Sequence, residues 1–250
     1  MQIFINGKDG GGWAIDMIRE DISSALNRLK IKQTRNFLKA DIIHNIWWNR
    51  ILDWKYFHLR FKKNILLTAV NYIDLEDNNY FMKTKFDKAN KFIKAWIAPS
   101  SKQKQILDKY SNNVFILPYY LNFDLFDYTK FVNRKTEILK KFSIPEKLVK
   151  NKIIIGSFQR DTDGSDFSKP KWQKGPELLI ELLKDLPKEK FILLLASARR
   201  HYVISECKKY GIPYFYIGKE TDVDDIEINN LSLSKMPDLY SITDLYLVTS

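Results

Sequence analysis

The sequence has almost no cysteine, few histidines and no long apolar run. Cys207 is the only cysteine among 250 residues, which excludes a disulfide framework and a cysteine cluster for zinc. The histidines at 44, 58 and 201 are scattered without the spacing of metal ligands, so we expect no metal site. No apolar run approaches the ~20 residues that span a bilayer, and residues 1–7 are typical of a strand rather than of a signal peptide. We therefore expect a cytoplasmic protein.

Acidic residues are outnumbered by basic ones. The chain has 41 Lys and Arg against 30 Asp and Glu, a net charge of +11. Such an excess suits an anionic partner, but the cations are dispersed along the chain and no nucleic-acid-binding motif is present. We expect no specific nucleic-acid binding. Peripheral contact with the anionic inner face of a membrane is compatible with the charge.

Apolar runs typical of strands alternate with helical patterns along the whole chain, which predicts an α/β fold with parallel sheets. The charged segment 123–150, with Pro145, is interpreted as a linker between domains at 1–145 and 146–250. Strands are expected at 2–5, 40–46, 64–70, 95–99, 114–118, 153–158, 191–196, 214–217 and 244–248. Helices are expected at 14–29, 80–94, 102–109, 134–142, 176–186 and 200–210, with a short one ending at 241. The last strand has no covering helix after it, so we expect the second domain to be incomplete.

The strongest motif lies between the strand at 153–158 and the helix that begins at Pro176. Arg160 follows the strand, and Lys174 and Gly175 precede the helix. A helix N-terminus offers unpaired N–H groups and a partial positive charge, so these residues would hold a nucleotide diphosphate. The alternative is a solvated connection such as any α/β domain contains.

Gly10, Gly11 and Gly12 follow the first expected strand and precede a helix. Consecutive glycines let a backbone approach a bound group closely, although a flexible surface loop has the same composition. The run does not match the spaced glycines of a dinucleotide site, so no nicotinamide or flavin cofactor is expected.

His44 lies at the end of the strand at 40–46, where ligands bind in parallel sheets, and is a candidate catalytic residue. The alternative is a core histidine with its hydrogen bonds satisfied. Trp47 and Trp48 are interpreted as packing a domain face, with a hydrophobic wall for an acceptor as the alternative. Cys207 is interpreted as a small core or surface thiol. The acidic residues at 222, 224, 225 and 227 are interpreted as a solvated loop.

In their order and spacing, these segments resemble glycosyltransferase family 4, the group 1 sugar transferases of GT-B fold. The resemblance rests on the glycine loop and on segments 40–44, 96–103, 118–126, 155–176 and 239–250. It implies two Rossmann-like domains, with the acceptor bound by 1–145 and the donor by 146–250.

The resemblance also implies an activity, the retaining transfer of a sugar from a nucleotide-diphosphate sugar to a glycan or lipid-linked acceptor in polysaccharide synthesis. No cofactor or metal is implied. Arg160 and Lys174 match the two cations that hold the donor diphosphate. The insertion 161–173 lengthens their spacing, so Lys169, Lys171 or Arg199 are alternatives to Arg160. The two glutamates with which the family grips the donor are expected after the strand at 244–248, where the chain stops, so we expect this 250-residue fragment to be inactive.

Two other functions fit the sequence. A sugar-nucleotide epimerase of GT-B fold also grips a nucleotide diphosphate, but needs acid and base side chains in its cleft. A non-catalytic basic binding protein would instead show steeply salt-dependent binding to anionic polymers or vesicles.

Overall fold

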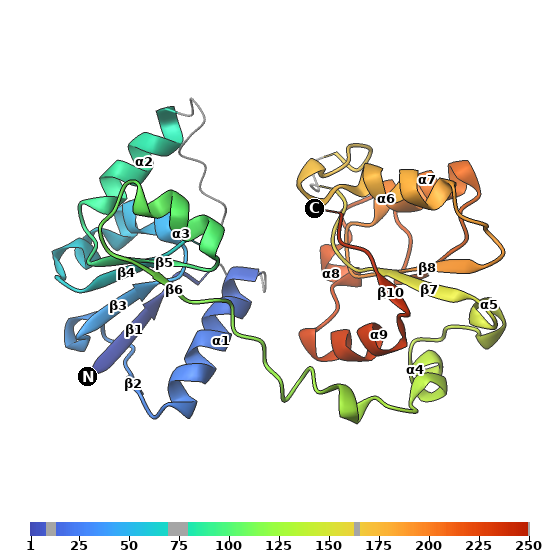
Figure 1. The fold of residues 1–250 in the computed structure, drawn as a ribbon, viewed down its shortest axis with the longest axis horizontal. Helices are drawn as coiled ribbons and strands as arrows, with labels where there is room; N and C mark the ends of the chain where they lie inside the picture. Colours follow the sequence, from blue (N-terminus) through green and yellow to red (C-terminus); the bar gives the residue numbers. More distant parts are fainter. Residues whose placement is uncertain (9–13, 70–79, 163–165, 250) are drawn as a thin grey trace. The chain divides into compact units, whose positions relative to one another are not determined.

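The computed structural model describes residues 1–8, 14–69, 80–162 and 166–249, and divides the chain into two compact units (Figure 1). The units are Met1–Asn122 and Phe123–Ser250. The division lies earlier than the expected boundary near residue 145. The reason is that Ile138, Leu139 and Ile144, in the expected linker, are buried in the core of the second unit.

The first unit contains a six-stranded parallel sheet in the order β2-β1-β3-β4-β5-β6. Its strands are β1 (Gln2–Asn6), β2 (Lys32–Gln33), β3 (Ile42–Asn45), β4 (Ile65–Thr68), β5 (Ala95–Ala98) and β6 (Val114–Ile116). Its α-helices are α1 (Ala14–Arg28), α2 (Tyr80–Asn90) and α3 (Ser101–Asp108). Three 3₁₀ helices, η1 (Phe37–Lys39), η2 (Trp48–Leu52) and η3 (Trp54–Phe61), flank β3.

Aromatic side chains form the centre of this first core. Phe86 of α2 stacks on Trp96 of β5 with ring centroids 4.8 Å apart, and Trp48 meets both rings edge-on. All three side chains are buried. Trp48 therefore packs the inner face of the unit, as the sequence predicts.

The second unit contains a four-stranded parallel sheet in the order β10-β7-β8-β9. Its strands are β7 (Ile153–Ser157), β8 (Phe191–Ala196), β9 (Tyr214–Ile217) and β10 (Leu245–Tyr246). Its α-helices are α4 (Lys135–Lys141), α5 (Glu146–Val149), α6 (Pro176–Lys184), α7 (His201–Tyr210), α8 (Ile226–Asn229) and α9 (Met236–Ile242). The 3₁₀ helices are η4 (Tyr128–Lys130), η5 (Trp172–Lys174) and η6 (Leu233–Lys235).

Helices cover both faces of the second sheet, α6 and α7 on one and α9 on the other (Figure 1). Successive strand residues alternate between the two cores, so Leu194 packs toward α9 and Leu195 toward α6 and α7. Cys207 lies in the second of these cores, where burial raises the pKa of its thiol to about 12. It is thus a packing residue, one of the two interpretations that the sequence allows.

Each sheet has a point at which the strand order reverses. In the first unit β1 lies between β2 and β3, and in the second β7 lies between β10 and β8. Open parallel sheets bind ligands at the carboxyl ends of the strands on either side of such a reversal. We therefore expect ligand sites at the carboxyl ends of β1 and β3 and at those of β7 and β10. Among the described residues, no helix is both long and apolar enough to cross a membrane.

Candidate functional site

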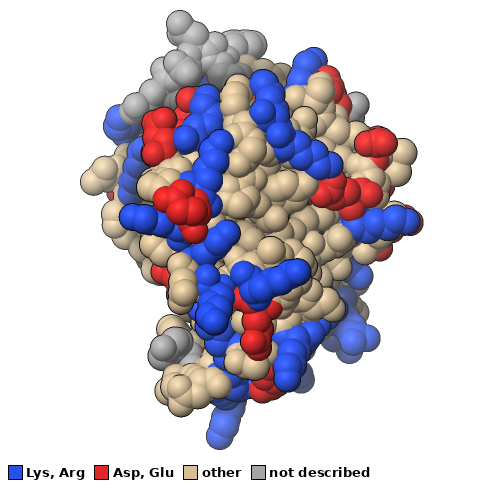
Figure 2. All heavy atoms as spheres, turned by 90° about the vertical axis from the view of Figure 1, so that its right-hand side faces the viewer, with Lys and Arg blue, Asp and Glu red and all other residues tan. Residues whose placement is uncertain are grey.

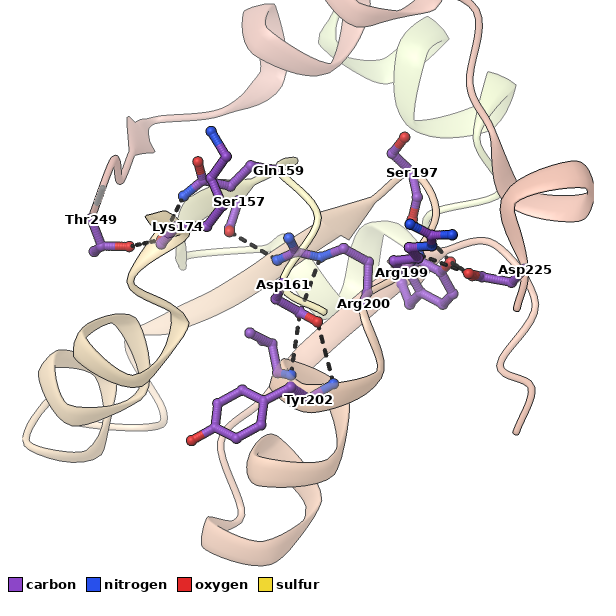
Figure 3. A network of polar contacts seen from close by, with 12 residues as sticks. Ser157, Gln159, Asp161, Lys174, Ser197, Arg199, Arg200, Tyr202, Asp225 and Thr249 are labelled. Atoms are coloured by element: carbon purple, nitrogen blue, oxygen red, sulfur yellow. Dashed lines mark hydrogen bonds and ion pairs between the residues drawn. The ribbon is translucent and has the colours of Figure 1, made fainter. Parts of the chain in front are cut away.

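Lys174 and Gly175 lie at the reversal point of the second sheet, where η5 turns into α6. Gly175 has φ +52°, and a Cβ atom on it would come within 2.1 Å of the carbonyl oxygen of Thr249. The Oγ1 of Thr249 donates a hydrogen bond of 2.9 Å to the carbonyl of Lys174 (Figure 3). The start of α6 thus lies directly against the segment that follows β10. Both this close approach and the positive φ require glycine at position 175.

Arg160 and Lys174 line one narrow hollow at this point. Ser157, Arg200 and Thr249 line it as well. The Nε2 of Gln159 donates to the carbonyl of Lys174 over 3.2 Å, which ties the loop after β7 to the start of α6. The hollow is too narrow for a water molecule, so a diphosphate enters only if the half-buried side chains of Arg160 and Lys174 move outward.

Arg200 is a site residue that the sequence analysis did not single out. It precedes α7, and only 1% of it is exposed. Its Nη2 donates to the Oγ of Ser157 over 2.9 Å, and its Nε lies 3.7 Å from the Oδ2 of Asp161 (Figure 3). Nε and Nη1 have no hydrogen-bond partner among the described residues. A buried guanidinium with spare donors beside a hollow is suited to an anionic ligand.

Asp161 connects three loops around the hollow. Its carboxylate accepts hydrogen bonds from the backbone N–H groups of Tyr202 and Val203, at 3.3 and 3.2 Å, in the first turn of α7. Its carbonyl accepts from the backbone N–H of Lys171 over 2.6 Å. Burial raises the pKa of this carboxyl to about 6, against the opposing effects of Arg200 and of the two N–H groups.

The other cations that the sequence offers for the diphosphate lie elsewhere. Lys169 is exposed and pairs with Asp166 at 3.3 Å. Lys171 gives its backbone N–H to Asp161, and the guanidinium of Arg199 pairs with Asp224 at 2.7 Å. None of these three lines the hollow.

The loop between β8 and α7 has a strained backbone. Ser197 and Arg199 have φ values of +72° and +60°, which non-glycine residues adopt at a cost. Asp225 stabilises this loop, because its carboxylate accepts from the backbone N–H of Arg199 at 2.8 Å and from the hydroxyl of Tyr216 at 3.1 Å. Asp225 is buried, so the interpretation of the whole acidic loop as solvated is wrong at this residue. Nor does the loop gather metal ligands: in the described parts of the chain, no three His, Cys, Asp or Glu side chains are placed to share an ion.

A second, larger hollow shares Arg200. Its volume is about 590 Å³, within the range of small-molecule sites, and it lies between α7 and the segment 219–225. Phe167 stacks on His201 at one wall, with ring centroids 4.3 Å apart. Figure 2 shows Lys and Arg interspersed with acidic and uncharged residues on the face that it presents.

The first unit has a polar cluster at its own reversal point. The Nε2 of His44 lies 2.7 Å from the Oγ1 of Thr68, and the Nδ2 of Asn6 donates to the Oδ1 of Asn45 over 2.5 Å. Burial lowers the pKa of His44 to about 4, so its imidazole is neutral at pH 7. Gly10, Gly11 and Gly12, which follow β1, lie outside the described residues.

No protein-family model matches the chain, and no curated protein matches it in sequence. Solved structures match it in fold. HepE of Anabaena, solved with UDP-glucose, matches with TM-score 0.67 and 14% identity over 100% of this chain and 74% of HepE. A glycosyltransferase of Rickettsia africae matches with TM-score 0.55 and 17% identity, over 100% of this chain and 72% of its own.

Sucrose-phosphate synthase of Thermosynechococcus elongatus matches with TM-score 0.56 and 11% identity, over 94% of this chain and 55% of the synthase. At such identities the likeness is one of fold alone. That fold is GT-B, with two Rossmann-like units of parallel sheet, as the sequence predicts.

Proposed function

We propose that this protein is a glycosyltransferase that takes its sugar from a nucleoside-diphosphate sugar. The observation that carries the proposal is the grouping of Lys174, Gly175 and Arg160 at the reversal point of the second sheet, with Arg200 buried behind them. This is where parallel sheets bind ligands and where a helix N-terminus favours an anion. HepE, of similar fold, was solved with UDP and with UDP-glucose, so a uridine diphosphate donor is the first to test.

The chemistry follows from the charge that develops on the leaving group. The nucleoside diphosphate departs with growing negative charge, which Lys174, Arg160 and the first turn of α6 are placed to stabilise. Gly175 has no side chain to keep the phosphates from the backbone. Arg200 holds Ser157 by a hydrogen bond. Its Nε and Nη1, which have no hydrogen-bond partner among the described residues, would donate to the phosphates. The 590 Å³ hollow on the other side of Arg200 would take the nucleoside.

The finer parts of the proposal rest on the family resemblance of the sequence. Transfer retains the anomeric configuration, needs no metal, and goes to a glycan or lipid-linked acceptor held by the first unit. In that unit, His44 lies in β3 near its carboxyl end, where an acceptor would bind. His44 is neutral but buried, and its Nε2 already lies 2.7 Å from the hydroxyl of Thr68, so it would reach an acceptor hydroxyl only if the surrounding residues moved.

The test is the binding of UDP to the chain by isothermal titration calorimetry. Lys174→Ala should weaken binding by at least about tenfold, because it removes a charge-assisted contact. Lys169→Ala is the matched control and should change it less than about twofold, since that side chain is exposed and outside the hollow. Equal affinities for the two variants, or no binding of UDP, GDP, ADP or dTDP by the wild type, would contradict the proposal.

Activity is then measured by following the fate of the donor and the configuration of the product. Incubating UDP-glucose without acceptor separates the transferase from the epimerase, since slow release of UDP indicates a transferase and a changed sugar indicates an epimerase. With an acceptor present, the anomeric configuration of the product by NMR tests retention.

A further inference from the structure

The first unit carries a cluster of exposed apolar side chains. On η3, Trp54 is 85% exposed, Phe57 41% and Phe61 74%, and Leu38 of η1 is 66% exposed. The rings of Trp54 and Phe57 stack at 5.3 Å, and Phe57 meets Phe61 edge-on at 5.2 Å. We call these four residues the apolar ridge. A contiguous group of large exposed apolar side chains indicates a surface that a partner covers.

The ridge belongs to the folded part of the unit. Leu59, in the same helix, is fully buried in the core, and the Nε of Arg60 donates to the carbonyl of Ile51 over 2.8 Å. The Nζ of Lys62 donates to the carbonyl of Leu38 over 2.8 Å, which fixes η1 beside the end of η3. The inner residues of η3 therefore hold it in place while the ridge faces solvent.

The two segments that carry the ridge hold charges of one sign. Segments 35–39 and 54–63 contain six cationic residues and no acidic one. They are Arg35, Lys39, Lys55, Arg60, Lys62 and Lys63. The neighbouring carboxylate of Asp53 is paired with Arg50 at 3.1 Å. The ridge thus presents aromatic and aliphatic groups within a basic rim.

We propose that the apolar ridge docks this protein on an anionic lipid surface. Trp, Phe and Leu side chains insert at the boundary between headgroups and acyl chains, while Lys and Arg attract anionic headgroups. A soluble saccharide would use the faces of the rings, but it gains little from the aliphatic Leu38 or from a rim of cations. The proposal concerns the first unit alone and does not depend on the donor site of the second.

The experiment is co-sedimentation of the chain with vesicles of mixed phosphatidylglycerol and phosphatidylcholine, compared with vesicles of phosphatidylcholine alone. Wild type should bind the anionic vesicles, and added salt should weaken the binding. The double variant Trp54→Ala/Phe61→Ala should bind them at least about tenfold more weakly. Trp172→Ala is the matched control, because Trp172 is 76% exposed on the second unit, and it should bind as wild type does.

A second variant separates the charges from the rings. Lys55→Glu/Lys63→Glu should lose both affinity and most of the salt dependence. All these side chains are exposed, so circular dichroism should match wild type in every variant, and the affinity for UDP should match it in the variants of the first unit.

Three results would overturn the proposal. The first is absence of wild-type binding to anionic vesicles. The second is equal binding by the ridge variant and by Trp172→Ala. The third is ridge-dependent binding of soluble oligosaccharides without binding of vesicles, which would assign the ridge to a saccharide.

Discussion

Arg200 reaches across the carboxyl edge of the second sheet and donates a hydrogen bond of 2.9 Å from its Nη2 to the Oγ of Ser157. Both side chains are buried, and the carboxylate of Asp161 lies 3.7 Å from the Nε of the same guanidinium. The end of β7 is thereby joined to the start of α7. The two loops that frame the narrow hollow are held by one buried ion pair.

Replacing Arg200 should destabilise the fold strongly. Arg200→Met keeps most of the apolar stem but leaves Asp161 buried without its cation, so we expect a loss of about 3–5 kcal/mol in the free energy of unfolding. Arg134→Met is the control, because Arg134 pairs with Glu137 at 2.6 Å on the surface, and its replacement should destabilise the fold much less. Urea denaturation measures both. Similar losses of stability in the two variants would show that the buried ion pair contributes no more than the surface pair.

Asp161 should make the protein more stable in mild acid. Its pKa in the folded state, about 6, is raised by burial and lies above the ~3.9 of an unfolded aspartate. Protonation therefore favours folding, and this contribution is complete below about pH 4 and is lost as the pH rises through about 6. Relative to Asp161→Asn, which does not titrate, wild type should gain on the order of 2–3 kcal/mol between pH 7 and pH 4. Urea midpoints at the two pH values measure the gain, and a difference between the proteins that does not change with pH would contradict it.

The central strands could be predicted because their signal is local. Phe191–Ala196 is a continuous apolar run, and all six residues are buried, as helices on both faces require. The sequence signal of the edge strands is weaker. The run at 244–248 gives only Leu245–Tyr246, and the two-residue β2 was not predicted, because pairing at an edge depends on a neighbouring strand rather than on composition.

Segment 47–63 was not assigned to any element beyond its two tryptophans, although it forms η2 and η3. A 3₁₀ helix has three residues per turn and is normally short, so the 3.6-residue pattern of an amphipathic α-helix does not reveal it. The outward position of Trp54 and Phe61 could not be predicted for the same reason. Aromatic composition alone indicates a core.

The residues around the narrow hollow could be predicted only in part. Lys174, Gly175 and Pro176 carry local signals of a helix start, and they lie where the sequence predicts. Arg200 gave no such signal, because its role depends on Ser157, which is 43 positions away in the chain and comes near only through the sheet. Asp225 was misread for the corresponding reason, since its partners are Arg199, in the loop before α7, and Tyr216, in β9.

The contribution of His44 to stability should change with pH in the opposite direction to that of Asp161. Burial lowers its pKa to about 4, below the ~6.5 of an unfolded histidine, so the neutral form favours folding. The resulting stability is present above about pH 6.5 and is lost as the pH falls toward about 4. Against His44→Gln, whose amide can still bond the hydroxyl of Thr68, wild type should lose roughly 3 kcal/mol over that range. Urea unfolding at several pH values gives the sign, and a gain in wild type on acidification would contradict it.

Gly175 and Gly211 offer a matched pair for testing the start of α6. Both have positive φ, +52° and +62°, but a Cβ on Gly211 would meet only the Nζ of Lys188 at 3.6 Å, whereas one on Gly175 would meet the carbonyl oxygen of Thr249 at 2.1 Å. Gly211→Ala should therefore cost about 1 kcal/mol, the backbone penalty alone. Gly175→Ala should cost more, about 2–4 kcal/mol, and should also weaken the binding of UDP, because α6 must move away from the segment after β10.

Thermal or urea unfolding and calorimetry separate the two effects. If both variants lose the same stability and bind UDP as wild type does, then the contact between Gly175 and Thr249 does not shape the site. Loss of UDP binding in Gly175→Ala alone, at a stability that still keeps the chain folded, would instead tie the affinity to the close approach of these two segments. That result would support binding of the anion beside Gly175, at the reversal point between β7 and β10.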